Sequence, residues 1–165
     1  MADEQDLGSV YRRHWALVRG CALRIVGDTA AADDVTQEVF MRYWAYCEKG
    51  GATAQNTSAF LYKSAAHTAL NYLRANKRRS TREHAHAPID GITPEPEAAL
   101  TVRWLLAQVP EDLAQIAAYH YLEGMEHEEI AELLSMQRRT VGRRLEAFRV
   151  QARALLEGPR AEVAP

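Results

Sequence analysis

Apolar residues recur every three or four positions along almost the whole chain, and no segment alternates with a period of two. In the N-terminal half, this spacing runs from Val10 to Ile25, from Ala32 to Trp44 and from Phe60 to Leu73. Such spacing places apolar side chains on one face of an α-helix, whereas a half-buried strand requires strict alternation. The sequence therefore predicts an all-α fold without a sheet.

Capping and turn residues divide these apolar segments into separate helices. Either Asp28 or Thr29 is suited to cap the second helix, because a short side-chain oxygen can accept from a free backbone N–H. Residues 50–57 have the composition of a loop. After it, Thr57 or Ser58 is suited to cap a third helix.

Several large side chains follow the apolar faces of the first two helices. We expect Trp15, Leu17 and Trp44 to face the core. Cys21 and Cys47 lie on the same faces, so buried reduced thiols are favoured over a disulfide. Reduced thiols are typical of a cytoplasmic protein.

A change in composition divides the chain into two helical domains. Residues 81–97 contain three prolines and few large apolar residues, which is typical of a flexible linker. Helical spacing then resumes, and Pro110 opens a further helix with Ile116 and Tyr121 expected inward and Gly124 closing it. The expected organisation is two small domains, at residues 1–80 and 98–157, with this linker between them and a tail at 158–165.

Six arginines lie between residues 136 and 153, whereas residues 126–134 contain four glutamates and neither lysine nor arginine. A short acidic helix, a three-residue turn and a basic helix together predict a helix-turn-helix. In that motif the second helix enters the DNA major groove.

The apolar residues of the basic helix, Val141, Leu145 and Phe148, are spaced to face inward. The residues left facing outward are then Arg138, Arg139, Gly142, Arg143 and Glu146, with Arg144 towards the flank. Arginine can read guanine through two parallel hydrogen bonds, and it can also clamp a phosphate. A solvated arginine-rich surface is the alternative, but the surrounding motif favours DNA.

A polar stripe accompanies the apolar face of the second predicted helix. Asp34, Gln37 and Glu38 lie about one turn apart, beside Val35 and Phe40. Acidic residues in the first turn of a helix interact favourably with the positive end of the helix dipole, and this alone would explain the acidic residues here. A stripe of this kind can equally dock another helical surface.

The third predicted helix combines aromatic and polar residues. Its aromatics are Phe60, Tyr62 and Tyr72, and its interleaved polar residues are Lys63, His67, Asn71 and Arg74. Aromatic faces can stack on unpaired bases while nearby cations hold the phosphates. An amphipathic core helix with a solvated basic end explains the same pattern, so both interpretations stay open from these residues alone.

Taken in order, the three segments resemble an extracytoplasmic-function (ECF) sigma factor of bacterial RNA polymerase. Residues 32–40, Ala-Asp-Asp-Val-Thr-Gln-Glu-Val-Phe, are similar to the family's Ala-Glu-Asp-Leu-Val-Gln-Glu-Val-Phe, which docks on the clamp helices of the largest polymerase subunit. Residues 60–74 resemble the helix that reads and melts the −10 element. Residues 129–141 resemble the motif that binds the −35 element.

The resemblance implies a site for each partner. Polymerase docking would use Asp33, Asp34, Gln37, Glu38 and Phe40. Contacts to the −10 element would use Phe60, Lys63, His67, Asn71, Arg74, Lys77 and Arg78. Contacts to the −35 element would use Arg138, Arg139, Thr140, Arg143 and Arg144. The resemblance also implies an anti-sigma factor as a partner, beside core RNA polymerase and promoter DNA.

Some positions differ from the family pattern. His67 replaces a usual asparagine, Asn71 a common aspartate and Phe60 a frequent tryptophan. Ser135 stands where the turn usually has glycine, and Gly142 where the recognition helix is often basic.

Several other classes of protein have little support in the sequence. No paired carboxylates, nucleophile–base pair or glycine-rich phosphate loop is present, so we expect neither an enzyme nor a cofactor. His84 and His86 lack further ligands at zinc spacing, so we expect no metal site. No apolar run is long enough to insert into a membrane.

Two alternatives to a sigma subunit remain at this stage. A stand-alone helix-turn-helix regulator would explain residues 126–153 but would leave residues 32–44 and 58–79 unused. A sigma-like decoy that engages only a regulatory protein is the other. The net charge of −2 is low for a protein that coats DNA, which indicates localised DNA contacts.

Overall fold

Two helical units make up the chain, and the all-α class predicted from the sequence is confirmed. The computed structural model describes residues 7–51, 56–82 and 97–157, and within these ranges it contains seven α-helices and no strand. The units cover residues 1–93 and 94–165. Residues 83–96 of the expected linker, with His84 and His86, and the expected tail at 158–165 lie outside the described residues.

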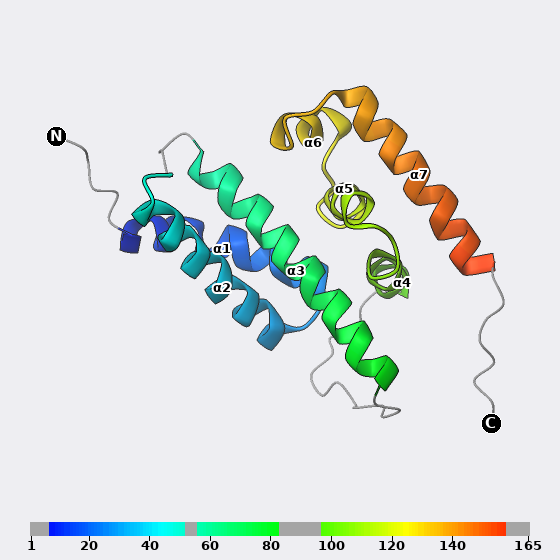
Figure 1. Cartoon of the computed structure of the whole chain (residues 1–165), viewed down its shortest axis with the longest axis horizontal. Helices are drawn as coiled ribbons and strands as arrows, with labels where there is room; N and C mark the ends of the chain where they lie inside the picture. The colour runs from blue at the N-terminus through cyan, green and yellow to red at the C-terminus, as the bar shows by residue number, and fades with distance from the viewer. Residues whose placement is uncertain (1–6, 52–55, 83–96, 158–165) are drawn as a thin grey trace. The chain divides into compact units, whose positions relative to one another are not determined.

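The first unit is a bundle of three helices, each packed against the other two (Figure 1). They are α1 (Leu7–Val26), α2 (Thr29–Glu48) and α3 (Thr57–Arg82), so α3 continues two residues beyond the expected domain boundary at 80. The apolar stripe of each helix supplies the core. Its fully buried members include Val18, Ile25, Val39, Leu61 and Leu70.

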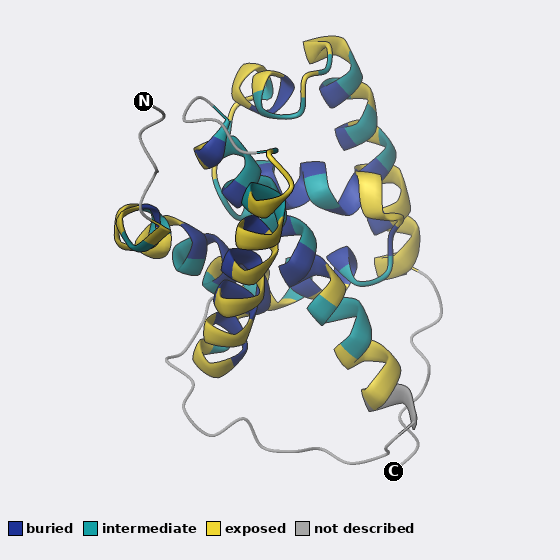
Figure 2. Cartoon of the chain, turned by 60° about the vertical axis from the view of Figure 1, so that its left-hand side comes forward, coloured by how far each residue is buried: buried dark blue, intermediate teal, exposed yellow. Residues whose placement is uncertain are grey.

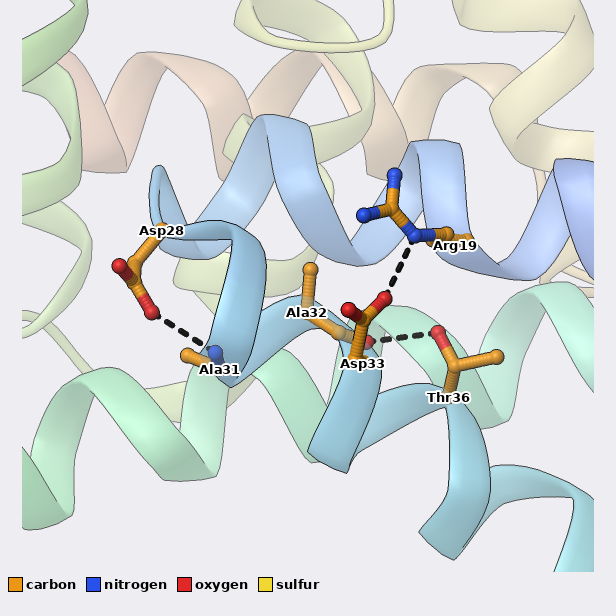
Figure 3. Close-up of polar contacts among 6 residues, drawn as sticks. All are labelled: Arg19, Asp28, Ala31, Ala32, Asp33 and Thr36. Carbon is orange, nitrogen blue, oxygen red and sulfur yellow. Dashed lines mark hydrogen bonds and ion pairs between the residues drawn. The ribbon is translucent and has the colours of Figure 1, made fainter. Parts of the chain in front are cut away.

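A tight turn between α1 and α2 follows from two adjacent residues. Gly27 has a φ of 76°, and its N–H donates to the Leu23 carbonyl at 2.8 Å. Asp28 then adopts extended backbone, and its carboxylate accepts from the Ala31 N–H at 2.7 Å (Figure 3). The structure therefore selects Asp28, and not Thr29, as the cap of α2. A cap of this kind contributes about 1 kcal/mol.

The expected cap of α3 was placed one or two residues too late. The Phe60 N–H donates to the Asn56 carbonyl at 2.9 Å, so Asn56 is the residue that precedes the first turn. Thr57 has another role. Its buried hydroxyl lies 3.0 Å from the Tyr43 hydroxyl and connects α3 to α2.

The second unit is built around α5 (Glu111–Tyr121), which packs against α4 (Glu97–Leu106), α6 (His127–Leu133) and α7 (Arg138–Glu157). Its most buried large side chains include Tyr119, Leu106, Ile116, Ile130 and Leu145. Figure 2 shows buried residues lining the inner sides of these helices, with exposed residues outward.

Four side chains that we expected to face the core are partly exposed. The exposed fractions are 39% for Trp15, 41% for Leu17, 38% for Trp44 and 41% for Tyr121. Each lies beside the buried stripe of its helix, and the neighbouring helices cover only the centre of that stripe. The sequence spacing alone does not separate the centre of a stripe from its edges.

The sequence also led us to expect buried reduced cysteines, no metal site and no membrane-spanning helix. Cys21 is buried as expected, whereas Cys47 is half-buried, and both are free thiols. Within the described ranges, no three histidine, cysteine or acidic side chains gather as a metal site would require. The described helices include none with the length and apolarity needed to cross a bilayer.

Candidate functional site

An open apolar groove lies between α1 and α2. It has a volume of about 520 Å³ and is lined by Gly8, Tyr11, Arg12, Gln37, Phe40, Met41 and Trp44. Met41 and Trp44 are 64% and 38% exposed, whereas Phe40 is only 1% exposed. The Phe40 ring packs against Tyr11, with ring centroids 4.7 Å apart, and so forms the floor of the groove.

A second hollow adjoins this groove on the same two helices. It measures about 380 Å³ and shares Tyr11 and Gln37 with the first. Its other lining residues are Trp15, Arg19, Asp33 and Thr36. Contiguous exposed apolar residues with a polar rim are typical of a surface that binds another protein. We refer to the two hollows together as the α1–α2 groove.

Three acidic residues of α2 differ in their surroundings, and of these Asp33 lines the second hollow. The Asp33 carboxylate accepts from Arg19 Nε at 2.6 Å, which ties α2 to α1 (Figure 3). Glu38 pairs with Arg42 one turn along α2, at 2.5 Å. Asp34 is exposed and forms no ion pair with another described residue. Asp34 is therefore the carboxylate most available to a partner.

The polar residues of α3 form one stripe along that helix. The successive positions 60, 63, 67, 71, 74 and 78 differ by three or four, so they share a face, and Lys77 borders it. Leu61, Ala65 and Ala69 on the opposite side are buried. Asn71 Nδ2 lies 3.0 Å from His67 Nε2, so the amide donates to the imidazole. The basic end of this stripe is exposed at Lys77 and Arg78.

An aromatic cluster lies where this stripe begins. The Phe60 and Tyr46 rings are stacked, 4.5 Å apart and 10° from parallel, and Tyr43 lies 5.8 Å from Phe60. Burial raises the pKa of the Tyr43 hydroxyl, while its hydrogen bond to Thr57 opposes the shift. Phe60 is therefore in part a packing residue as well as a candidate DNA contact.

The predicted helix-turn-helix is present in the second unit, as α6 and α7. A capping box begins α6, where the Glu126 N–H donates to the Glu129 carboxylate at 2.7 Å. In the turn, the N–H groups of Ser135 and Met136 donate to the Glu132 and Ala131 carbonyls at 3.2 and 2.9 Å. These two bonds form a Schellman motif, which requires a left-handed residue at position 135. Ser135 has a φ of 52° accordingly.

The α7 arginines divide into paired and unpaired residues. Arg138 pairs with Glu128 of α6, and Arg144 Nε lies 3.7 Å from Asp112 of α5. Arg139 and Arg143 are exposed and form no ion pair with a described residue. Val141, Leu145 and Phe148 are buried as predicted, which turns the face with Arg139 and Arg143 outward. Thr140 is half-buried in the first turn.

Sequence reasoning missed several residues of these surfaces. Tyr11 and Met41 line the α1–α2 groove, and Tyr46 stacks on Phe60, but none of them was singled out. Tyr11 and Trp15 are four residues apart, and Met41 and Trp44 are three apart. That spacing would have placed each pair on one helix face. It would not have shown that the two faces meet.

Comparisons with known proteins match both units. Sigma-70 region 2 matches residues 10–79, and sigma-70 region 4 matches residues 101–149. The first range contains the α3 stripe and all residues that line the α1–α2 groove except Gly8, and the second contains α6 and most of α7.

Curated relatives match over most of their length. The chain is 32% identical to an ECF RNA polymerase sigma factor of Mycobacterium tuberculosis, SigL, over 87% of this chain and 85% of that protein. It is 34% identical to the RNA polymerase sigma-H factor of Pseudomonas aeruginosa, over 78% and 74% of the two chains.

Among solved structures, the fold is similar to that of the sigma factor RpoE from Bartonella quintana, determined in complex with the anti-sigma factor NepR. The TM-score is 0.53 at 16% identity, covering 94% of this chain and 99% of the other. This likeness supports the fold.

Proposed function

Because the chain belongs to the ECF sigma factors, with region 2 and region 4 of the sigma-70 family, we propose that it binds core RNA polymerase and directs transcription initiation at promoters with −35 and −10 elements. Sigma factors are promoter-specificity proteins, so we assign the chain no catalytic step. The observation that carries the proposal is the presence of both an acid-rimmed apolar groove and a helix-turn-helix in one chain, each in its matching region. Its site of action is the cytoplasm, where the polymerase works.

The α1–α2 groove is the proposed docking surface for core polymerase. Asp34 offers an unpaired carboxylate, and Glu38 lies one turn beyond Asp34 on α2. Gln37, between them, lines both hollows. Asp33 acts through its ion pair with Arg19, which fixes α2 against α1. Phe40 supports the groove from below, because it is buried.

The α3 stripe is the proposed contact with the melted −10 element. Lys63, Arg74, Lys77 and Arg78 supply positive charge along one face for the phosphates of a single strand. The His67–Asn71 pair offers hydrogen-bonding groups to an unstacked base. Extruding a base costs a few kcal/mol, which such contacts must offset.

The outward face of α7 is the proposed contact with the −35 element. Arg139 and Arg143 have exposed guanidinium groups, and Thr140 offers a hydroxyl in the first turn. Arg138 pairs with Glu128 of α6 and Arg144 with Asp112 of α5, and both carboxylates are exposed. Exposed pairs are weak, so both arginines can exchange a carboxylate for a phosphate.

An anti-sigma factor is a further proposed partner. The RpoE structure that shares this fold was determined with such a protein bound. The exposed apolar residues of the α1–α2 groove offer a surface that a protein inhibitor could cover in competition with polymerase.

Run-off transcription with core polymerase and host promoter DNA tests the proposed function. We expect promoter-dependent transcripts when the chain is added, and a footprint over both elements. Co-purification with core polymerase but no footprint would indicate a decoy. A footprint without any association with polymerase would indicate a stand-alone regulator.

The docking surface is tested by charge reversal at Asp34. We expect Asp34→Lys to weaken association with core polymerase at least about thirtyfold, because removing one partner of a charge pair buried at an interface costs about 2–5 kcal/mol. This change breaks no described ion pair. Glu157→Lys is the matched control, because Glu157 is an exposed acid at the last residue of α7, in the other unit. Equal affinity of the two variants would contradict docking through the groove.

A further inference from the structure

The turn that ends α2 leaves no space for a side chain at residue 51. Gly50 has a φ of 74°, and its N–H donates to the Cys47 carbonyl at 2.8 Å. The Gly51 N–H donates to the Tyr46 carbonyl at 3.0 Å. These two bonds form a Schellman motif, which returns the residue after the left-handed glycine to the last helical turn.

Gly51 lies directly against the ring of Tyr46. A Cβ at Gly51 would be 2.2, 2.5 and 2.6 Å from the Cε2, Cζ and Cδ2 atoms of that ring. An atom beyond the edge of a ring could not be so close to three of its carbons at once. The Gly51 backbone therefore covers a face of Tyr46.

Phe60 covers the Tyr46 ring from α3. The two rings are nearly parallel at 4.5 Å, which is a full stacking contact. The first turn of α3 is held a second time through Thr57, whose hydroxyl lies 3.0 Å from that of Tyr43. The end of α2 thus holds the start of α3 through one stack and one buried hydrogen bond.

We propose that Tyr46, held by Gly51, is a positioning residue for opening of the −10 element. Gly51 and Phe60 both pack against its ring, and Tyr46 itself is half-buried. It acts on DNA through Phe60, by fixing the first turn of α3 from which the stripe of Lys63 and His67 continues. This inference rests on the proposed function and extends it to the step of strand opening.

Positioning matters because the cost of unstacking must be met as each base leaves the duplex. Side chains that are already held in position when the base leaves need not be ordered at that moment, so their contacts with the base carry a smaller entropy cost. A first turn of α3 that shifts between positions would capture the base less often. Duplex binding through α7 does not depend on that turn.

Two disruptive variants and two matched controls test the proposal in the full chain bound to core polymerase. Tyr46→Leu removes the stack, and Gly51→Ala forces the ring away from its position. Tyr46→Phe keeps the stacking ring. Gly50→Ala strains the same turn, but a Cβ at Gly50 meets nothing within 4 Å.

The measurement is the rate of promoter opening, followed with a fluorescent base analogue in the −10 element of a promoter that the wild-type chain opens. We expect Tyr46→Leu and Gly51→Ala to slow opening about threefold to tenfold, the factor that one aromatic pair is worth. Tyr46→Phe and Gly50→Ala should open the promoter at close to the wild-type rate. Affinity for core polymerase and for a −35 duplex should be unchanged in all four.

Equal opening rates for Tyr46→Leu and Tyr46→Phe would overturn the inference. A parallel loss of opening and core affinity in Tyr46→Leu and Gly51→Ala would overturn it as well, because Tyr46 would then be needed for folding of the first unit alone. A wild-type chain that opens no promoter with core polymerase would contradict the proposed function itself, and the two failures are therefore distinguishable.

Discussion

At the scale of single residues, the backbone of the helix-turn-helix turn carries a local strain. Ser135 is the one non-glycine residue of the described ranges with a positive φ. A side chain in the left-handed region costs energy because Cβ approaches the backbone carbonyl. The Schellman motif keeps Ser135 there, since its two hydrogen bonds close the end of α6.

Replacing Ser135 by glycine should relieve this strain. We expect Ser135→Gly to stabilise the chain by up to about 1 kcal/mol, since the left-handed cost exceeds the entropy that glycine adds to the unfolded state. Denaturant unfolding measures this. Ser135→Ala keeps the Cβ and should give no gain. Destabilisation by Ser135→Gly would show that the serine hydroxyl contributes more than the strain costs.

A second residue-scale prediction concerns Gly142 in α7. A Cβ there would meet only the His127 imidazole nitrogen, at 3.9 Å, which is an ordinary contact. Gly142→Ala should therefore stabilise the helix by up to about 1 kcal/mol. Gly124→Ala is the contrasting control. Gly124 has a φ of 70°, so alanine should destabilise there. Weaker −35 binding by a more stable Gly142→Ala chain would assign the glycine to close approach of DNA.

At the scale of elements, α7 combines a packing face and a binding face. Val141, Leu145 and Phe148 fix its rotation in the second unit, and Arg139 and Arg143 face outward as a result. The ion pairs of Arg138 and Arg144 then connect α7 with α6 and α5. The fixed rotation of α7 and the charge of its arginines together make one side of this helix suited to bind a polyanion.

The outward face of α7 predicts how DNA binding depends on salt. Loss of one phosphate contact in Arg143→Ala should reduce the slope of log affinity against log salt by about 0.9. Arg153→Ala is the matched control, since Arg153 is exposed at the other end of the same helix. Binding of holoenzyme to −35 duplex DNA across a salt series measures both slopes. An unchanged slope in Arg143→Ala would remove Arg143 from the phosphate contacts.

At the scale of the whole molecule, positive charge is concentrated in two places and is not spread over the surface. The chain has a net charge of −2, yet the end of α3 and the outer face of α7 are basic. Such a chain has little non-specific attraction to DNA, since that attraction comes from phosphate neutralisation. Two local contacts used together on one polymerase gain from effective concentration, because the second binding event becomes intramolecular.

The low net charge predicts that polymerase is needed for strong promoter binding. We expect the isolated chain to bind a promoter fragment at least about a hundredfold more weakly than the holoenzyme does at equal salt, in line with the gain from linked sites. Fluorescence anisotropy with a labelled fragment measures both affinities. Equal affinities would favour a stand-alone regulator over a sigma subunit.

Local chemistry made much of the fold predictable. The apolar spacing gave the helical class, the pair Asp28 and Thr29 gave one helix boundary to within a residue, and Val141, Leu145 and Phe148 gave the inward face of α7. The residues proposed for polymerase, −10 and −35 contact came from motifs, and their roles stay predictions. The cap of α3 was misplaced because several polar residues there could each serve as a cap.

The sequence by itself determined where helices form and which stripe of each is apolar, because hydrogen bonding, capping and helical period act within a few residues. Only the tertiary structure decided that Trp15 and Trp44 border an open groove, and that Gly51 and Phe60 both pack against the ring of Tyr46. Those outcomes depend on how one helix crosses another. Side chains at the edge of an apolar stripe are buried or exposed according to that crossing, which no local period encodes.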